Sequence, residues 1–511
     1  MLILDKMDDD VRLIPGTQSV ENSPTSASRH AVSHQSSSNS LVQTVYTVYT
    51  RRWYMLLTLC LLNASNAMLW ISFSPIANIT AEFYGVDTMA VNWLSLVFLV
   101  ASIPCGFFAT WLLDSLGLRT GLITGAWINL IGSVLRLVSG LNVPEAAAYP
   151  LVIIGQTIAA CAQPFLLFAP TKLAALWFEE NHRATANMIA SMSNPLGILL
   201  ANILSPVIVN SKADFPLMLE IYTAPAILTT LMATFGIWSA LPPTPPTASA
   251  AEQHESFFEG LRDILRNKAY WVLFFAFGTG VALFNTLSSL LEQVFCARGY
   301  SDDFAGICGA LLIGCGVIGA GVAGVIVDKT KKFEEVAKLC YVMAALSLIF
   351  FTLISMHRDQ PALVALSLAL FGFFGFALYP VCLELGVECT FPVAEGTSAG
   401  FLMISGQIIG VVFIMIMQVI AQPLSAENMP YQVCTGNQTL GDTNITPLDY
   451  TIPDLVLSGA ASLAACVLLL AFWCPYKRLR RETQSVANPI LNFSGSAAGG
   501  SSNSQVNTQL Q

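Results

Sequence analysis

The sequence predicts an all-α membrane protein, in which twelve transmembrane helices form two pseudo-symmetric six-helix halves and both termini are cytosolic. Three observations support this fold class: an apolar composition, long apolar segments and a weak internal repeat. Of the 511 residues 54% are hydrophobic and only 11% are charged, and the mean hydropathy is +0.64. Soluble globular proteins carry about 25% charged residues, so the composition excludes that class and indicates a polytopic membrane protein.

Twelve apolar segments are long enough to cross a bilayer as helices, which takes roughly 20 residues each. In lipid the backbone must satisfy its own hydrogen bonds, and a helix does so within one segment. The predicted helices cover residues 54–79, 91–113, 120–141, 149–172, 184–208, 217–241, 270–296, 304–327, 336–356, 361–386, 394–421 and 453–474.

Polar segments divide the chain into domains. Residues 1–50 are rich in serine, contain no cleavable signal peptide, and are predicted to form a disordered cytosolic tail. Residues 477–511 are predicted to form a second such tail. Between the six-helix halves, 51–241 and 270–476, lies a cytosolic linker, 242–269, which begins with "PPTPPTAS" and continues as a short amphipathic helix.

Basic residues predict the orientation in the membrane. With a cytosolic N-terminus, 18 of the 23 Lys and Arg residues fall on the cytosolic side, as the positive-inside rule requires. The sequons at Asn437 and Asn444 then lie in the last outer loop, where N-glycosylation can occur, although short sequons also arise by chance.

The two halves repeat each other weakly. Asp114 in "LLDSLGLRT" and Asp328 in "GVIVDKTKK" are 214 residues apart and follow the second and eighth predicted helices. Gly197 and Gly410 are 213 residues apart, in the fifth and the eleventh. Transporters built from repeated halves bind their solute near mid-membrane, between the halves.

One loop motif supports a resemblance. Gly324-x-x-x-Asp328-Lys329 resembles the loop motif of the major facilitator superfamily, and Asp114-x-x-Gly117-x-Arg119 resembles its first-half copy. The resemblance implies a gating role for Asp114, Arg119, Asp328 and Lys329, in which an aspartate at a helix end pairs across the two halves on the cytosolic side. A solvated basic loop would explain the lysines but not the Gly-Asp spacing.

A narrower resemblance covers about residues 51–480. "NAMLWISFSPIANI", "ATWLLDSLGLR" and "VECTFPVAEGTSAG" resemble the feline leukaemia virus subgroup C receptor-related group, solute carrier family 49, and most of all its orphan branch named for a major facilitator domain. The family implies transport of small organic solutes: choline and ethanolamine for some members, a B6 vitamer for another, and haem by older proposals.

A polar stripe follows the first predicted helix. Asn63, Asn66, Trp70 and Ser74 are spaced i, i+3, i+7 and i+11, so they share one helix face. Such a face either borders a water-filled cavity or packs against other helices. We favour the cavity for Trp70, whose ring can hold a cation, as the resemblance to choline transporters implies. Both alternatives stay open for the asparagines.

The resemblance implies further pocket positions. Gln407 matches a pocket residue of the family, whereas Pro195 and Asn285 stand where the choline transporters carry a glutamine and a tyrosine. Half of the aromatic box for a quaternary ammonium is therefore absent, and a solute with more hydroxyl or amine groups fits better than choline. Gln163 in the fourth predicted helix is another candidate, with helix packing as the alternative.

Few ionisable residues lie within the predicted helices, and each is a candidate for function. Glu292 can attract cations or carry a proton, but it can equally be a vestibule residue reached by water. Glu384 and Glu388, at the cytosolic end of the tenth helix, are expected to pair with loop arginines as parts of a gate. Arg136 is expected to extend toward the membrane surface.

The N-terminal tail contains a short sorting pattern. Asp9 stands four residues before Leu13 and Ile14, which resembles an acidic dileucine signal and favours endosomal or lysosomal membranes over the plasma membrane. So short a pattern also arises by chance.

These patterns together predict a transporter and not an enzyme. The leading hypothesis is a secondary-active or facilitative transporter of a small cationic or zwitterionic organic solute that works by alternating access. A non-transporting receptor or sensor on the same fold is the alternative, and haem transport is a further one. We expect a monomer in the bilayer with no metal site, no cofactor and no nucleic-acid partner, because no metal-ligand spacing, P-loop or basic run occurs. Proton coupling and uniport both stay open.

Overall fold

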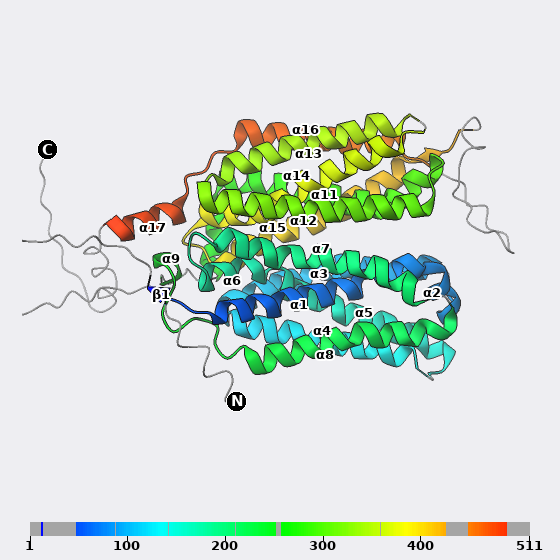
Figure 1. Ribbon diagram of the computed structural model, residues 1–511, viewed down its shortest axis with the longest axis horizontal. Helices are drawn as coiled ribbons and strands as arrows, with labels where there is room; N and C mark the ends of the chain where they lie inside the picture. Colours follow the sequence, from blue (N-terminus) through cyan, green and yellow to red (C-terminus); the bar gives the residue numbers. More distant parts are fainter. Residues whose placement is uncertain are drawn as a thin grey trace, which may run out of the picture.

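The computed structural model describes residues 12–13, 47–86, 88–141, 143–209, 211–251, 257–357, 359–425 and 448–487. In this part of the chain the long helices gather into two bundles that lie side by side (Figure 1). The first bundle contains α1 (Arg51–Ile71), α2 (Ala77–Tyr84), α3 (Thr88–Ser115), α4 (Leu118–Ser139), α5 (Glu145–Leu167), α6 (Ala169–Trp177), α7 (Arg183–Ile208) and α8 (Phe215–Gly236). The second contains α11 (Lys268–Ala297), α12 (Asp302–Thr330), α13 (Phe333–Ser355), α14 (Pro361–Thr390), α15 (Glu395–Ile420) and α16 (Thr451–Ala471).

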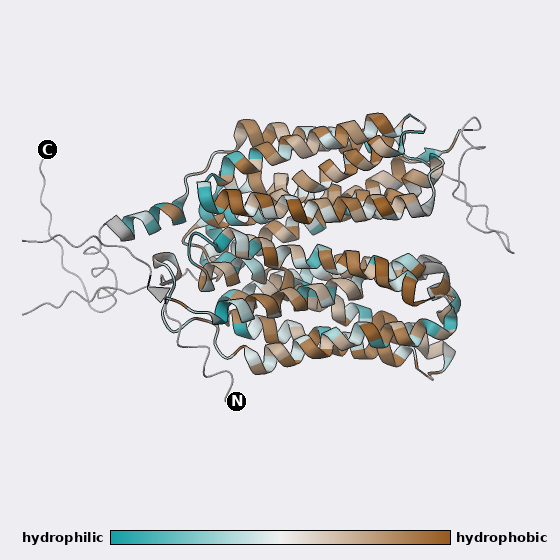
Figure 2. Cartoon of the chain, viewed as in Figure 1, coloured by the Kyte–Doolittle hydropathy of each residue, from teal (hydrophilic) through white to brown (hydrophobic). Residues whose placement is uncertain are grey.

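Twelve helical segments of the described chain are long and apolar enough to cross a membrane, which confirms the predicted number. One of them combines α5 and α6, and another continues from α1 into the 3-10 turn η2 (Ser74–Ile76). Hydrophobic residues cover most of the length of both bundles (Figure 2). Phe235, Val419 and Leu470 are 69%, 83% and 89% exposed, as expected for side chains that contact lipid instead of a protein core.

Small residues allow neighbouring helices to approach closely. A Cβ atom at Gly197 of α7 would overlap the Ala64 carbonyl oxygen of α1, and one at Gly372 of α14 would overlap the Leu312 carbonyl oxygen of α12. Close backbone contact of this kind is the usual way in which membrane helices pack, because lipid provides no hydrophobic drive for their association.

The two ends of the bundles differ. At one end, here called the α17 end, α17 (Lys477–Ala487) and the linker helix α9 (Ala248–Ala251) lie beyond the bundles on the side where α1 begins (Figure 1). The linker helix α10 (Phe257–Arg266) contacts α11 and α15. The opposite end, here called the α2 end, carries α2. Hydrophilic residues are concentrated at the α17 end (Figure 2).

Part of the predicted tails has defined structure. In the N-terminal tail the strand β1 (Arg12–Leu13) pairs antiparallel with β2 (Thr47–Val48). Outside the tails, a second pairing joins β3 (Gln422–Pro423) to β4 (Leu448–Asp449) in the loop before α16. Residues 477–487, which we expected to be disordered, form α17. The physical reason is a set of buried ion pairs with distant helices, described below, which the polar composition of this segment does not reveal.

Candidate solute-binding cavity

A cavity of about 120 Å³, partly open to solvent, lies between the two bundles. Helices α1, α3, α5 and α7 line it on one side and α11, α13, α14, α15 and α16 on the other. Its described lining contains no Asp, Glu, Lys, Arg or His. The lining is mainly apolar and combines aromatic rings with a few side-chain amides, namely Trp70, Phe277, Phe284, Tyr341, Phe371, Phe376 and Tyr379, with Gln163, Asn194, Asn285 and Gln407.

Trp70 lines this cavity from the last turn of α1. Its indole Nε1–H donates to the Ser95 carbonyl oxygen of α3 (3.1 Å), and its ring lies 6.4 Å from that of Phe98, centroid to centroid. The hydrogen bond holds the ring by one edge. A ring held in this way is a suitable surface for an organic cation, because the electron-rich face of an indole attracts positive charge.

The two asparagines of the predicted stripe lie elsewhere. Asn63 is buried and donates to the Leu166 carbonyl oxygen (3.1 Å), while Asn66 donates to Asn129 Oδ1 (2.9 Å) and to the Ala159 carbonyl oxygen (3.0 Å). Neither lines the cavity. The structure thus favours the packing alternative for both, since α1 turns this part of its polar face toward α4 and α5.

The end of α1 is held by two buried side chains of the first bundle. Arg136 of α4, only 1% exposed, donates to the Leu69 carbonyl oxygen (3.0 Å) and to Ser72 Oγ (2.5 Å). Gln156 of α5 donates to the same Leu69 oxygen (3.1 Å). Carbonyls at a helix C-terminus lack intrahelical partners and attract positive charge, so Arg136 points inward. Our expectation that it extends toward the membrane surface is wrong.

Side-chain amides approach the cavity from both bundles. Gln163 is already engaged, because its Oε1 accepts a hydrogen bond from Ser102 Oγ (2.7 Å). Within the described chain, by contrast, Asn194 Nδ2 and Gln407 Oε1 are buried without any hydrogen-bond partner. Asn194 comes from α7 and Gln407 from α15, so an unpaired donor and an unpaired acceptor belong to opposite bundles. Sequence reasoning overlooked Asn194, which directly precedes Pro195 in a helix with little polar periodicity.

Two aspartates bind helix N-termini of the opposite bundle. Asp328, near the end of α12, accepts hydrogen bonds from the backbone N–H groups of Ala184 (2.9 Å) and Thr185 (2.7 Å) in the first turn of α7. Asp114, near the end of α3, accepts one from the Thr397 hydroxyl (2.5 Å) in the first turn of α15. Helix N-termini carry partial positive charge, so both carboxylates stabilise contact between the bundles at the α17 end.

The basic residues of these loops are arranged differently from the expectation. Arg119 donates to the Ile237 carbonyl oxygen (2.9 Å) within its own bundle, and Lys329 is exposed. The lysine that reaches the other bundle is Lys331, whose Nζ donates to the Glu180 carbonyl oxygen (2.6 Å). Among the residues of these two loop motifs, the described hydrogen bonds to the opposite bundle therefore involve the aspartates and Lys331, and not Arg119 or Lys329.

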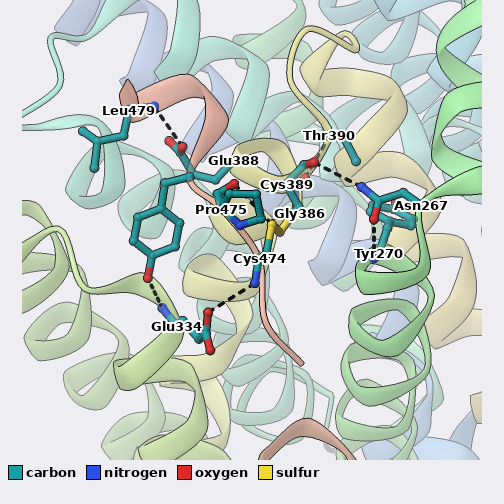
Figure 3. The surroundings of a disulfide bond; sticks show 11 residues. Asn267, Tyr270, Glu334, Gly386, Glu388, Cys389, Thr390, Cys474, Pro475 and Leu479 are labelled. Carbon is teal, nitrogen blue, oxygen red and sulfur yellow. Dashed lines mark hydrogen bonds between the residues drawn. A yellow bond between two sulfur atoms is a disulfide. The ribbon is translucent and has the colours of Figure 1, made fainter. Parts of the chain in front are cut away.

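Glu384 and Glu388 are buried at the α17 end and share one cation. Arg478 of α17, itself 1% exposed, donates to Glu384 Oε2 (2.6 Å) and Glu388 Oε1 (2.8 Å). Glu388 also accepts the Leu479 backbone N–H (3.0 Å; Figure 3). Asn187 of α7 donates to Glu384 (3.0 Å) from the opposite bundle. The expected arginine partner thus comes from the C-terminal helix and not from an interhelical loop.

The remaining candidates are outside the described part of the chain. The side chain of Glu292 and all of Asp9, Ile14, Asn437 and Asn444 fall there. Leu13 lies in β1, opposite Thr47. Among the described residues, no group of three or more His, Cys, Asp or Glu side chains can hold a metal ion.

Comparison with known proteins agrees with this fold. The family model described as "Major Facilitator Superfamily" matches residues 59–421 of this chain. "Solute carrier family 49 member A3" of Danio rerio is 46% identical over 446 residues, which are 87% of this chain and 92% of the relative. "Choline/ethanolamine transporter flvcr2a" of Danio rerio is 31% identical over 384 residues, 72% of this chain and 80% of the relative. The chain therefore belongs to the major facilitator superfamily and, within it, to the solute carrier family 49 group.

Solved structures share the fold at low sequence identity. The proton:xylose symporter XylE superposes with a TM-score of 0.63 at 14% identity, covering 85% of this chain and 98% of XylE. The transporter FucP in the outward conformation superposes with a TM-score of 0.61 at 15% identity, covering 82% of this chain and 99% of FucP. Membership of this family identifies the chain as a transporter-type membrane protein and not an enzyme.

Proposed function

We propose that this protein moves a small cationic or zwitterionic organic solute, of choline, ethanolamine or vitamin type, across a membrane by alternating access. The observation that carries the proposal is the cavity between the bundles, which is mainly apolar and aromatic, with a few side-chain amides and without a charged side chain in its described lining. The relatives named as choline/ethanolamine transporters support this class of solute.

The cavity chemistry suits a cation that also carries a hydroxyl group. With no carboxylate in the described lining, positive charge is stabilised by the face of Trp70, an interaction worth about 2 kcal/mol in a desolvated site. A hydroxyl group is both donor and acceptor, so it suits an unpaired donor such as Asn194 Nδ2 and an unpaired acceptor such as Gln407 Oε1. A solute that bonds to both residues would join the two bundles. Haem fits poorly, since no described lining residue is a His to ligate iron or a base to pair its propionates.

Alternating access is supported by the contacts at the α17 end. There Asp114, Asp328, Glu384 and Lys331 bind groups that belong to the opposite bundle. Such contacts exist only while that end is closed, so they stabilise one state of a two-state cycle. We assign the α17 end to the cytosol, because most basic residues of the sequence fall on that side.

The membrane and the coupling ion are part of the proposal. A dileucine signal at Leu13 and Ile14 would direct the protein to endosomes or lysosomes, whose acidic lumen offers a proton gradient. Glu292 would then take up the coupling proton. Passive uniport, without proton coupling, is the alternative. Separately, Asn437 and Asn444 would carry N-linked glycans in the lumen or outside the cell.

An untargeted comparison of metabolites in cells with and without the protein should identify the solute. Flux of that solute into proteoliposomes then tests transport, with Trp70→Ala as the site variant and Trp127→Ala as the matched control, because Trp127 of α4 is 47% exposed on the outer surface. Flux lost in Trp70→Ala and kept in Trp127→Ala is expected. Binding of the solute without flux in the wild type would instead identify a receptor or sensor.

A further inference from the structure

A disulfide fastens the beginning of α17 to the second bundle. Cys474, which follows α16, is bonded to Cys389 near the end of α14, with 5.8 Å between their Cα atoms (Figure 3). Cys389 is the neighbour of Glu388 in sequence, and Cys474 precedes Arg478 by four residues. The covalent link and the buried ion pair thus hold the same short segment of chain.

Helix α17 also contacts the first bundle. Glu482, one turn after Arg478, pairs with Arg183 of α7 (2.9 Å) and accepts a hydrogen bond from Ser249 of α9. Burial by itself would raise the pKa of Glu482, but Arg183 and Arg478 hold it below its ordinary value. Since buried charges of α17 bind α14 on one side and α7 on the other, this helix acts as a latch across the α17 end.

Both cysteines border a groove, although Cys389 is fully buried and Cys474 is only 5% exposed. This groove lies at the α17 end and is also bordered by Asn267, Arg266 and Pro475. With the α17 end on the cytosolic side, as proposed above, the bond lies in a reducing compartment, where a structural disulfide is rare and a regulatory one is formed and broken. A small thiol in this groove would meet the bond from the Cys474 side when the short segment between α16 and α17 opens locally.

We propose that Cys389 and Cys474 form a reversible thiol–disulfide site that controls how firmly the α17 latch is closed. In reduction, a thiolate of the glutathione class attacks one sulfur, and a second such thiol releases the mixed disulfide. Two protein thiols and one small disulfide result, with two electrons taken from the reductant. Oxidation by a small disulfide reverses these steps. The effect of the site on flux rests on the proposed transport function, whereas its effect on the latch does not.

Amide hydrogen exchange tests the latch directly, because exchange reports local opening. Full-length protein in lipid nanodiscs is equilibrated with glutathione disulfide or with reduced glutathione, and exchange is followed in a peptide that spans residues 474–487. We expect severalfold faster exchange in the reduced form. A peptide from α2, at the opposite end, should exchange equally in both.

Two variants provide the controls. Cys474→Ser should exchange at the fast rate under both conditions, and Cys466→Ser, which removes an exposed cysteine of α16, should behave as the wild type. Mass labelling with a maleimide counts free thiols in each sample. Equal exchange of wild-type 474–487 in both states, or two free thiols at Cys389 and Cys474 after oxidation, would overturn the proposal. No substrate is needed, so a failure of the transport hypothesis leaves this result intact.

Discussion

Replacing Arg478 with alanine should open the α17 end. The side chain is 1% exposed and is the cation shared by Glu384 and Glu388, at 2.6 and 2.8 Å. Burial would lower the pKa of this guanidinium, but Glu388 and Glu384 raise it above its ordinary value, so the group is charged throughout the accessible pH range. Its removal leaves two buried carboxylates without their counter-ion.

The magnitude follows from the cost of an uncompensated buried charge. Removing one partner of a buried ion pair costs about 3–5 kcal/mol. If an open state lets the two glutamates reach water, that cost falls on the closed state alone. At ~1.4 kcal/mol for each factor of ten, the closed state loses about 100-fold to 4000-fold in relative population. This is enough to reverse a two-state equilibrium that favours closure by a few kcal/mol.

Double electron–electron resonance, which measures the distance between spin labels placed at Thr120 and Lys329, checks this prediction. Both positions are exposed and belong to opposite bundles near the α17 end. Arg478→Ala should shift the distance distribution to longer values, while Arg480→Ala, on an exposed position of the same helix, should not. An unchanged distribution in Arg478→Ala would refute the reasoning.

A charge-free variant tests the cause. Arg478→Met combined with Glu384→Gln and Glu388→Gln removes all three charges and leaves no uncompensated one. Buried ion networks can often be replaced by neutral groups at little cost, so this variant should return to the closed distribution. If it stays open, the latch depends on packing of α17 and not on the balance of charge.

Further predictions concern the cavity and its support. Trp70→Ala should weaken solute binding about 30-fold, the equivalent of a ~2 kcal/mol cation–π contact, in a calorimetric titration; unchanged affinity would remove Trp70 from the site. Asp328→Asn should slow turnover more than it weakens binding, since the carboxylate binds α7 only in the closed state; equal losses in stopped-flow and equilibrium measurements would exclude a gate. Arg136→Gln should lower the free energy of unfolding in detergent by about 1.5–3 kcal/mol for each charge-assisted hydrogen bond lost, which is seen as a lower melting temperature. An unchanged melting temperature would contradict the anchoring role of Arg136. Glu292→Gln should abolish accumulation driven by a pH step in vesicles, and wild-type protein that merely equilibrates its solute would exclude proton coupling.

The sequence by itself was enough to predict the membrane class and the twelve spans. Lipid forces every crossing segment to be helical and apolar over a fixed length, so local composition is sufficient. The aspartates at the ends of α3 and α12 were also visible, because each follows an apolar segment and the two positions repeat between the halves at an offset of 214 residues. Family resemblance added the cavity positions of Trp70 and Gln407.

Only the tertiary structure decided what the polar residues touch. Helical periodicity places Asn63, Asn66 and Trp70 on one face, but it does not reveal whether that face meets a neighbouring helix or a cavity. In the structure the asparagines bind α4 and α5, whereas Trp70, in the last turn of the same helix, lines the cavity. Arg478 is 90 residues from Glu388, and no local pattern links two such positions. Which buried charges meet depends on how the helices pack, because a charge inside the fold is tolerated only where a partner from another element reaches it.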